Sequence, residues 1–91
     1  MQQIAFTSIL ERDKDGTWWY VHVPKHIRDQ LKHLERRGTI AVSATIGRTT
    51  WHASMLPWAD GSAQITVNKK VRDKEALTLG QELEVLIVPR I

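Results

Sequence analysis

The 91-residue chain contains no cysteine, only three prolines and five glycines, and no long apolar run. The absence of cysteine excludes disulfide bonds, thiolate catalysis and zinc sites built on cysteine ligands. No apolar segment approaches the roughly 18 residues that a membrane-spanning helix requires. The sequence also has no Gly-x-Ser-x-Gly elbow and no glycine-rich phosphate-binding loop. These absences leave a small fold and a binding role as the main questions.

The length predicts a single domain that spans residues 1–91. A domain of this size buries only about 60–65% of the surface that its unfolded chain exposes, so we expect little room for a deep substrate cavity. The N-terminus from Met1 to Ile4 has no basic region followed by an apolar one, and we therefore expect no signal peptide. With the absence of cysteine, this is typical of a cytoplasmic protein.

A short motif occurs twice. Val23–Asp29 (VPKHIRD) returns in similar form 44 positions later (67 − 23) as Val67–Asp73 (VNKKVRD), with four of the seven positions identical. In both copies a strand-like run precedes the motif, and a polar segment, a glycine and another strand-like run follow it. A repeat of this kind defines the building unit of a fold. The sequence therefore predicts two halves, about 1–46 and 47–91, each built as strand, strand, short helix, strand.

Residue alternation and turn signals place the individual elements. We predict strands at 4–10, 17–23, 39–46, 50–56, 62–67 and about 83–87, and helices from Lys25 to about Leu34 and roughly from Lys69 to Ala76. This is too little helix for crossovers between parallel strands. The pattern indicates a mainly β protein, either a small barrel or a sandwich.

The second predicted strand carries three of the six aromatic residues. Its alternation places Trp19, Val21 and Val23 on one face, and Trp18, Tyr20 and His22 on the other. Because valines favour burial, we expect the first face to meet the core. The second face would then leave an aromatic pair beside a histidine, partly exposed.

Positive charge gathers in the two repeated segments. Residues 25–37 hold five Lys/Arg and two acids, and residues 69–75 hold four Lys/Arg and two acids, which gives +5 (nine minus four). The rest of the chain carries −2 (four minus six), for a formal charge of +3. If the segments lie close together they form one basic face. The alternative is that they are solvated helix surfaces.

The residues suited to catalysis do not form a recognisable group. The histidines are His22, His26, His33 and His52. His22 and His26 are four apart, but Pro24 between them interrupts the helix that would align them. A metal site needs at least three convergent ligands, and the sequence brings no such set together. We therefore expect no catalytic residue, no metal, no cofactor and no enzymatic activity.

One resemblance concerns the repeat. Val67–Val85 resembles the unit of the AbrB/MazE-like swapped-hairpin family, V-P-K-x-[IV]-R-x…L-x-x-G-[DQ]-x-[LV]-x-[VI]. Asn68 stands where that pattern has proline, and the other copy supplies the proline as Pro24. In that family two chains contribute the halves of one barrel, and basic residues near these units read DNA.

A second resemblance covers nearly the whole chain. It is to a bacterial domain-of-unknown-function family with the serial number nineteen-oh-five. The matching motifs are Trp18-x-Tyr20-Val21-x-Val23-Pro24, Arg37-Gly38, Ile46-Gly47, Ser54-Met55-Leu56-Pro57, Asp60-Gly61 and Val67-x-Lys69-x-Val71-Arg72. The resemblance implies a six-stranded double-split β-barrel with two short helices, in which one chain supplies both halves. It implies no established activity.

Two functional hypotheses follow. The first is a binding module for a protein or small ligand, as a monomer or weak homodimer away from membranes. It would use Trp18, Tyr20, Trp51 and Trp58, since exposed aromatics rimmed by arginine and lysine suit a partner site. The competing interpretation is that a small barrel uses its four tryptophans to fill the core and cap the ends.

The second hypothesis is a nucleic-acid-binding module of the AbrB-like kind. Its phosphate contacts would come from Lys25, Arg28, Lys69, Lys70 and Arg72. Against this, the arginine of each motif has a structural alternative, in which it lies over the barrel and pairs with Asp29 or Asp73.

Overall fold

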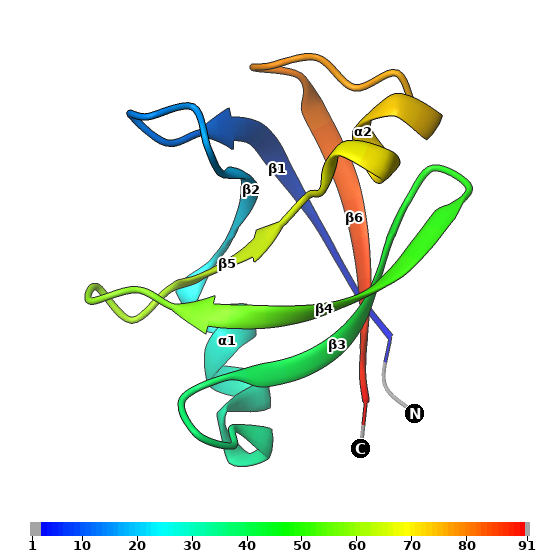
Figure 1. The fold of residues 1–91 in the computed structure, drawn as a ribbon. Helices are drawn as coiled ribbons and strands as arrows, with labels where there is room; N and C mark the ends of the chain where they lie inside the picture. The colour runs from blue at the N-terminus through cyan, green and yellow to red at the C-terminus, as the bar shows by residue number, and fades with distance from the viewer. Residues whose placement is uncertain (1–2, 91) are drawn as a thin grey trace.

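The computed structural model describes residues 3–90. Along the chain lie β1 (Ile4–Arg12), β2 (Trp19–Val23), α1 (Lys25–Leu31), a 3₁₀ turn (Lys32–Leu34), β3 (Ile40–Ile46), β4 (Thr49–Pro57), β5 (Ala63–Thr66), α2 (Lys69–Lys74) and β6 (Glu82–Pro89). The strands curve around a common interior and the helices lie outside it (Figure 1). The six strands and two short helices expected from the sequence are confirmed.

The strands form a closed barrel in the order β1-β2-β5-β4-β3-β6, with β6 pairing back to β1. Every neighbouring pair is antiparallel. Two strands change neighbours along their length. β1 pairs with β6 from Ile4 to Ile9 and with β2 from Leu10 to Arg12, and β4 passes in the same way from β3 to β5. The mainly β barrel class is therefore confirmed.

The pairing pattern has the twofold repetition that the sequence predicts. Exchanging β1 with β4, β2 with β5 and β3 with β6 returns the same set of neighbours. The contact between β2 and β5 lies across the pseudo-axis, where Val21 pairs with Ile65. These two residues are 44 positions apart (65 − 21), which equals the spacing of the two motifs. Each residue of this central pair is the repeat equivalent of the other.

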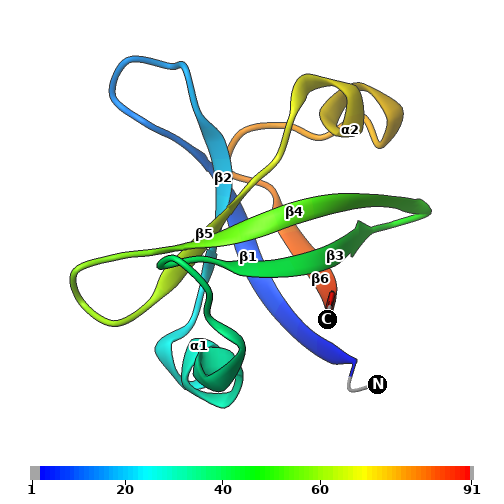
Figure 2. The ribbon, with the colours of Figure 1, turned by 60° about the horizontal axis from the view of Figure 1, so that its bottom comes forward.

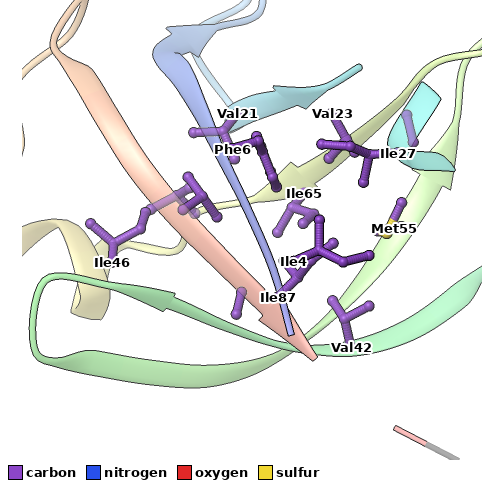
Figure 3. Close-up of a cluster of buried hydrophobic side chains, with 14 of the residues drawn as sticks. Ile4, Phe6, Val21, Val23, Ile27, Val42, Ile46, Met55, Ile65 and Ile87 are labelled. Atoms are coloured by element: carbon purple, nitrogen blue, oxygen red, sulfur yellow. The ribbon is translucent and has the colours of Figure 1, made fainter. Parts of the chain in front are cut away.

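Alternating side chains from the strands fill the interior (Figure 3). On β3 the alternation is strict, and Ile40, Val42, Ala44 and Ile46 are all buried. On β2, Val21 and Val23 are fully buried as expected. Trp19 departs from the prediction, because it is only half-buried and packs against the edge of the core. It is the first residue of its strand, at the mouth of the barrel.

The two helices begin differently although they occupy equivalent places. α2 is capped by Asn68, whose side-chain oxygen accepts a hydrogen bond from the Val71 amide at 3.0 Å. α1 follows Pro24, which has no side-chain acceptor. Both helices are shorter than predicted, and the first gives way to the 3₁₀ turn before Leu34. No helix within residues 3–90 is long and apolar enough to cross a membrane.

The helices lie at opposite ends of the barrel. α1 and α2 are well separated in two views that differ by a 60° turn (Figures 1 and 2). This follows from the repetition, since each helix follows one of the two strands that meet at the pseudo-axis. The two basic segments therefore do not form one continuous face.

Candidate functional site: an outer aromatic surface

Three aromatic rings from two hairpins are packed together on the outside of the barrel. Trp58, in the turn between β4 and β5, lies with its ring centroid 5.7 Å from that of Tyr20 in an edge-to-face arrangement. The His22 ring lies 4.8 Å from the same indole. Tyr20 and His22 point outward because they alternate with the buried Val21 and Val23. We call Trp18, Tyr20, His22 and Trp58 the outer aromatic surface.

The His22 ring is held in place by a series of hydrogen bonds that runs through Ser62 to Asp60. Ser62 is buried, with 3% of its surface exposed, and its hydroxyl donates to Oδ1 of Asp60 at 2.6 Å. The Ser62 amide donates to the same oxygen at 2.9 Å. The Ser62 oxygen lies 2.7 Å from Nε2 of His22. Since the only hydroxyl proton goes to the carboxylate, Nε2 of His22 is the donor in this contact.

These hydrogen bonds affect the pKa of Asp60 and the direction of the Ser62 hydroxyl. The side-chain and then the backbone hydrogen bond from Ser62 hold the pKa of Asp60 below its ordinary 3.8, and the nearby His22 lowers it further. Ser62 therefore directs its proton toward a carboxylate and away from the histidine, opposite to the arrangement that activates a serine nucleophile. The geometry orients the histidine ring.

The first strand also holds His22, through Ser8. The Ser8 hydroxyl donates to the His22 carbonyl at 2.8 Å and accepts from the His22 amide at 3.1 Å. At Ser8, β1 pairs with β6 and not with β2. The Ser8 side chain therefore makes the hydrogen bonds to β2 that backbone groups make from Leu10 to Arg12. Backbone and ring of His22 are thus both fixed.

Trp18 lies beside this cluster and is 54% exposed. It borders a hollow of about 210 Å³ together with Asp13, Tyr20, Leu56 and Gln64. Asp13 shapes the turn, because its Oδ1 accepts from the amides of Thr17 at 2.9 Å and of Trp18 at 3.2 Å. We refer to this cavity as the Trp18 hollow. Its charged wall is a carboxylate, so the arginine and lysine rim expected around the aromatics is not found here.

The pKa of Tyr20 reflects its burial and the negative charge around the hollow. Burial raises the pKa of Tyr20 above its ordinary 10.0, and the negative charges of Glu11 and then Asp13 raise it further. The surroundings of the phenol therefore disfavour an additional negative charge.

Trp51 is not part of this group. Its side chain is half-buried and packs against the hydrophobic core from β4. It borders a different hollow of about 200 Å³, near Thr66 and Asn68. The structure thus brings together Trp18, Tyr20 and Trp58 of the four predicted aromatic residues, and places Trp51 elsewhere.

The arginines of the two motifs are engaged in packing. The Arg72 guanidinium carbon lies 4.3 Å from the centroid of the Trp19 ring, and Arg72 Nε is buried without a hydrogen-bond partner among residues 3–90. Arg28 donates to the Gly61 carbonyl at 3.1 Å and to Glu35 at 3.2 Å. The Arg28 side chain is only 15% exposed, which leaves little of it to contact a phosphate.

The lysines of the same motifs are exposed. Lys25 pairs with Asp29 at 2.9 Å, and Lys69 pairs with Asp73 at 2.7 Å, each one helical turn along. Lys70 is exposed as well. The predicted pairing with these aspartates is therefore made by lysine rather than by arginine.

Several site residues were missed by sequence reasoning. The sequence patterns do not predict Asp13, Leu56, Asp60 or Gln64 as site residues. The register between β2 and β5 is what places Gln64 beside the site, because Gln64 pairs with His22. The spacing Asp60-x-Ser62 is also typical of a side-chain-stabilised turn.

The comparison with protein families identifies the class of protein. A model for a domain of unknown function, DUF1905, matches residues 6–87. That match covers 82 (87 − 6 + 1) of the 91 residues, so the chain belongs to the DUF1905 family. A search of curated proteins found no match. The family resemblance predicted from the sequence is confirmed.

Proposed function

We propose that the protein is a non-catalytic binding module that uses the outer aromatic surface to hold a small ligand or a protein segment. The observation that carries the proposal is the position of Trp18, 54% exposed at the edge of the hollow that it shares with Tyr20. A large apolar side chain exposed beside a concavity is typical of an interaction site.

The arrangement of the rings favours binding energetically. Tyr20, Trp58 and His22 support each other through ring contacts, and His22 is fixed by Ser8 and Ser62. A ligand that enters the hollow would therefore meet Tyr20 with its ring already held against Trp58. Ordering a mobile side chain on binding costs about 0.5–1.5 kcal/mol, and pre-ordered rings reduce that cost.

The nucleic-acid alternative has weaker geometric support. Its five residues are divided between helices at opposite ends of the barrel (Figure 2). Arg28 and Arg72 are occupied by contacts within the protein, and Lys25 and Lys69 each have an aspartate beside them. Binding to phosphates is strongest where unpaired cations share one face. For this reason we propose the aromatic surface as the binding site.

A direct test is to titrate ¹⁵N-labelled protein with phenol, methyl glucoside and choline chloride, one at a time, and follow the indole N–H signals of the four tryptophans. We expect at least one probe to shift the signals of Trp18 and Trp58, and Trp18→Ala to abolish that binding. Trp51→Ala is the control and should keep it. If no probe moves the Trp18 signal, or if Trp18→Ala binds as well as the wild type, the proposal is wrong.

A further inference from the structure

The charge around the Trp18 hollow is opposite in sign to that of the whole chain. The protein carries a formal charge of +3. Nevertheless, Asp13 is the charged group that lines the hollow, and within residues 3–90 no lysine or arginine borders it. The neighbouring Arg12 has its guanidinium carbon 5.6 Å from the Trp19 centroid instead. The hollow therefore carries local negative charge, although the net charge of the protein is positive.

The carboxylate retains capacity for a ligand. The two hydrogen bonds from the amides of Thr17 and Trp18 both end on Oδ1 of Asp13. The Asp13 amide donates to the Trp18 carbonyl at 3.0 Å, so the backbone holds the residue in place. The second carboxylate oxygen takes part in neither side-chain bond and can meet a cation. The remaining walls are the rings of Trp18 and Tyr20, the apolar Leu56 and the amide of Gln64.

Aromatic rings and a carboxylate around one cavity define a ligand chemistry. A cation over the face of tryptophan or tyrosine is attracted by the ring quadrupole, and alkylated ammonium groups are well suited because their methyl groups also contact apolar walls. A carboxylate adds a direct charge interaction. The pKa of Tyr20 is raised first by burial and then by the negative charges of Glu11 and Asp13, and this second contribution agrees with a site that attracts a cation.

We infer that the Trp18 hollow binds the alkylated ammonium group of a small organic cation. In this arrangement Trp18 and Tyr20 contact the cation through their rings, Leu56 contacts its alkyl groups, and Asp13 supplies the opposite charge. The inference rests on the proposed binding function and specifies its ligand class. A neutral molecule of the same shape should bind more weakly, because it gains the apolar contacts without the charge interactions.

The test compares choline with 3,3-dimethylbutan-1-ol, in which carbon replaces the charged nitrogen. Binding is followed by the Trp18 indole signal at neutral pH. We expect choline to bind at least about fivefold more tightly than the alcohol, and its affinity to fall as salt is raised. In Asp13→Asn the side-chain carbonyl can still accept from the Thr17 and Trp18 amides, so the turn should survive while choline binding weakens by about fivefold.

The matched control is Asp15→Asn, which removes the same charge from the same turn outside the hollow and should bind choline as the wild type does. Equal affinity for choline and the alcohol, or unchanged choline affinity in Asp13→Asn, would overturn the inference. Should Asp13→Asn unfold, the choline-to-alcohol ratio of the wild type decides alone. If phenol or methyl glucoside shifts the Trp18 signal but choline does not, the ligand class is wrong and the binding function remains. If none of the four probes shifts it, both fail.

Discussion

Tyr20 is the only tyrosine in the chain and stands between the Trp18 hollow and the Trp58 ring. Its neutral form is favoured by burial and by the two nearby carboxylates. Because its folded-state pKa is raised, the stability linked to Tyr20 is fully present below pH 10 and is lost as pH rises through the folded pKa. The residue therefore reports both the local field and the alkaline stability of the protein.

An alkaline titration followed by tyrosinate absorbance should place the Tyr20 midpoint above 10.0 in the folded protein. Asp13→Asn and Glu11→Gln should each move the midpoint down, since each removes a negative charge that opposes ionisation. Unfolding with urea gives the reference value in the same chain. A midpoint at or below the unfolded value, or one that neither substitution moves, would contradict the described field.

The sequence predicted the outward direction of Trp18, Tyr20 and His22, because strict alternation with buried valines leaves no other choice. Trp58 is also predicted as a site residue, but the alternation within β2 does not show that its ring lies against Tyr20 and His22. Trp58 belongs to the other half of the repeat, and only the register between β2 and β5 brings its hairpin beside β2. Contacts between halves depend on how the barrel closes, and no local pattern in the sequence records that.

At the level of elements, each helix sends one arginine to the opposite half of the barrel. α1 belongs to the first half, and its Arg28 holds Gly61 in the hairpin of the second. Gly61 has φ +93° and lies so close to Lys25 that a Cβ there would meet Lys25 Cε at 2.9 Å. α2 belongs to the second half, and its Arg72 covers Trp19 of the first. The two repeat arginines thus hold the halves together.

Replacing Arg72 with alanine should lower the free energy of unfolding by about 1–2 kcal/mol, since a largely desolvated cation–π contact is worth about that much. Arg72→Lys should keep part of the stability, because the charge remains while the planar contact with the indole is lost. Lys70→Ala, an exposed neighbour on the same helix, is the control and should change stability by no more than about 0.5 kcal/mol. Urea unfolding measures all three. Equal effects of Arg72→Ala and Lys70→Ala would show that Arg72 is solvated surface.

The types of the elements could be predicted because side chains alternate every two residues in a strand and about every 3.6 residues in a helix. The repeated motif indicated the order of the elements. The ends of the helices could not be predicted in this way. Leu31, Leu34 and Ile27 have helical spacing, yet the chain tightens into a 3₁₀ turn at Lys32 as it approaches the hairpin-like pairing of Arg36 with Thr39. Arg37 and Gly38, both with positive φ, make that pairing possible. The helix thus stops before a tight local turn that the apolar spacing does not indicate.

For the molecule as a whole, the repeat determines where the basic helices and the two central strands lie. A pseudo-twofold barrel places equivalent basic helices at opposite ends and brings the two central strands together. The likeness to AbrB-like proteins remains a prediction, whereas membership of the DUF1905 family is shown. The symmetry is broken in β2 and just before it, at Trp18, Tyr20 and His22, because the equivalent positions, 44 further on, are Ser62, Gln64 and Thr66. Three of the four residues of the outer aromatic surface therefore come from the first half, and their repeat equivalents are not aromatic.

The central claim is that Trp18 lies on the surface for contact with another molecule and does not support the barrel. The most direct test is the free energy of unfolding of Trp18→Ala beside that of Trp51→Ala, measured by chemical denaturation. We expect Trp18→Ala to lie within about 0.5 kcal/mol of the wild type. Trp51→Ala, which removes a ring packed on the core, should lose about 2 kcal/mol or more. A loss of that size in Trp18→Ala would make Trp18 a structural residue and contradict the account.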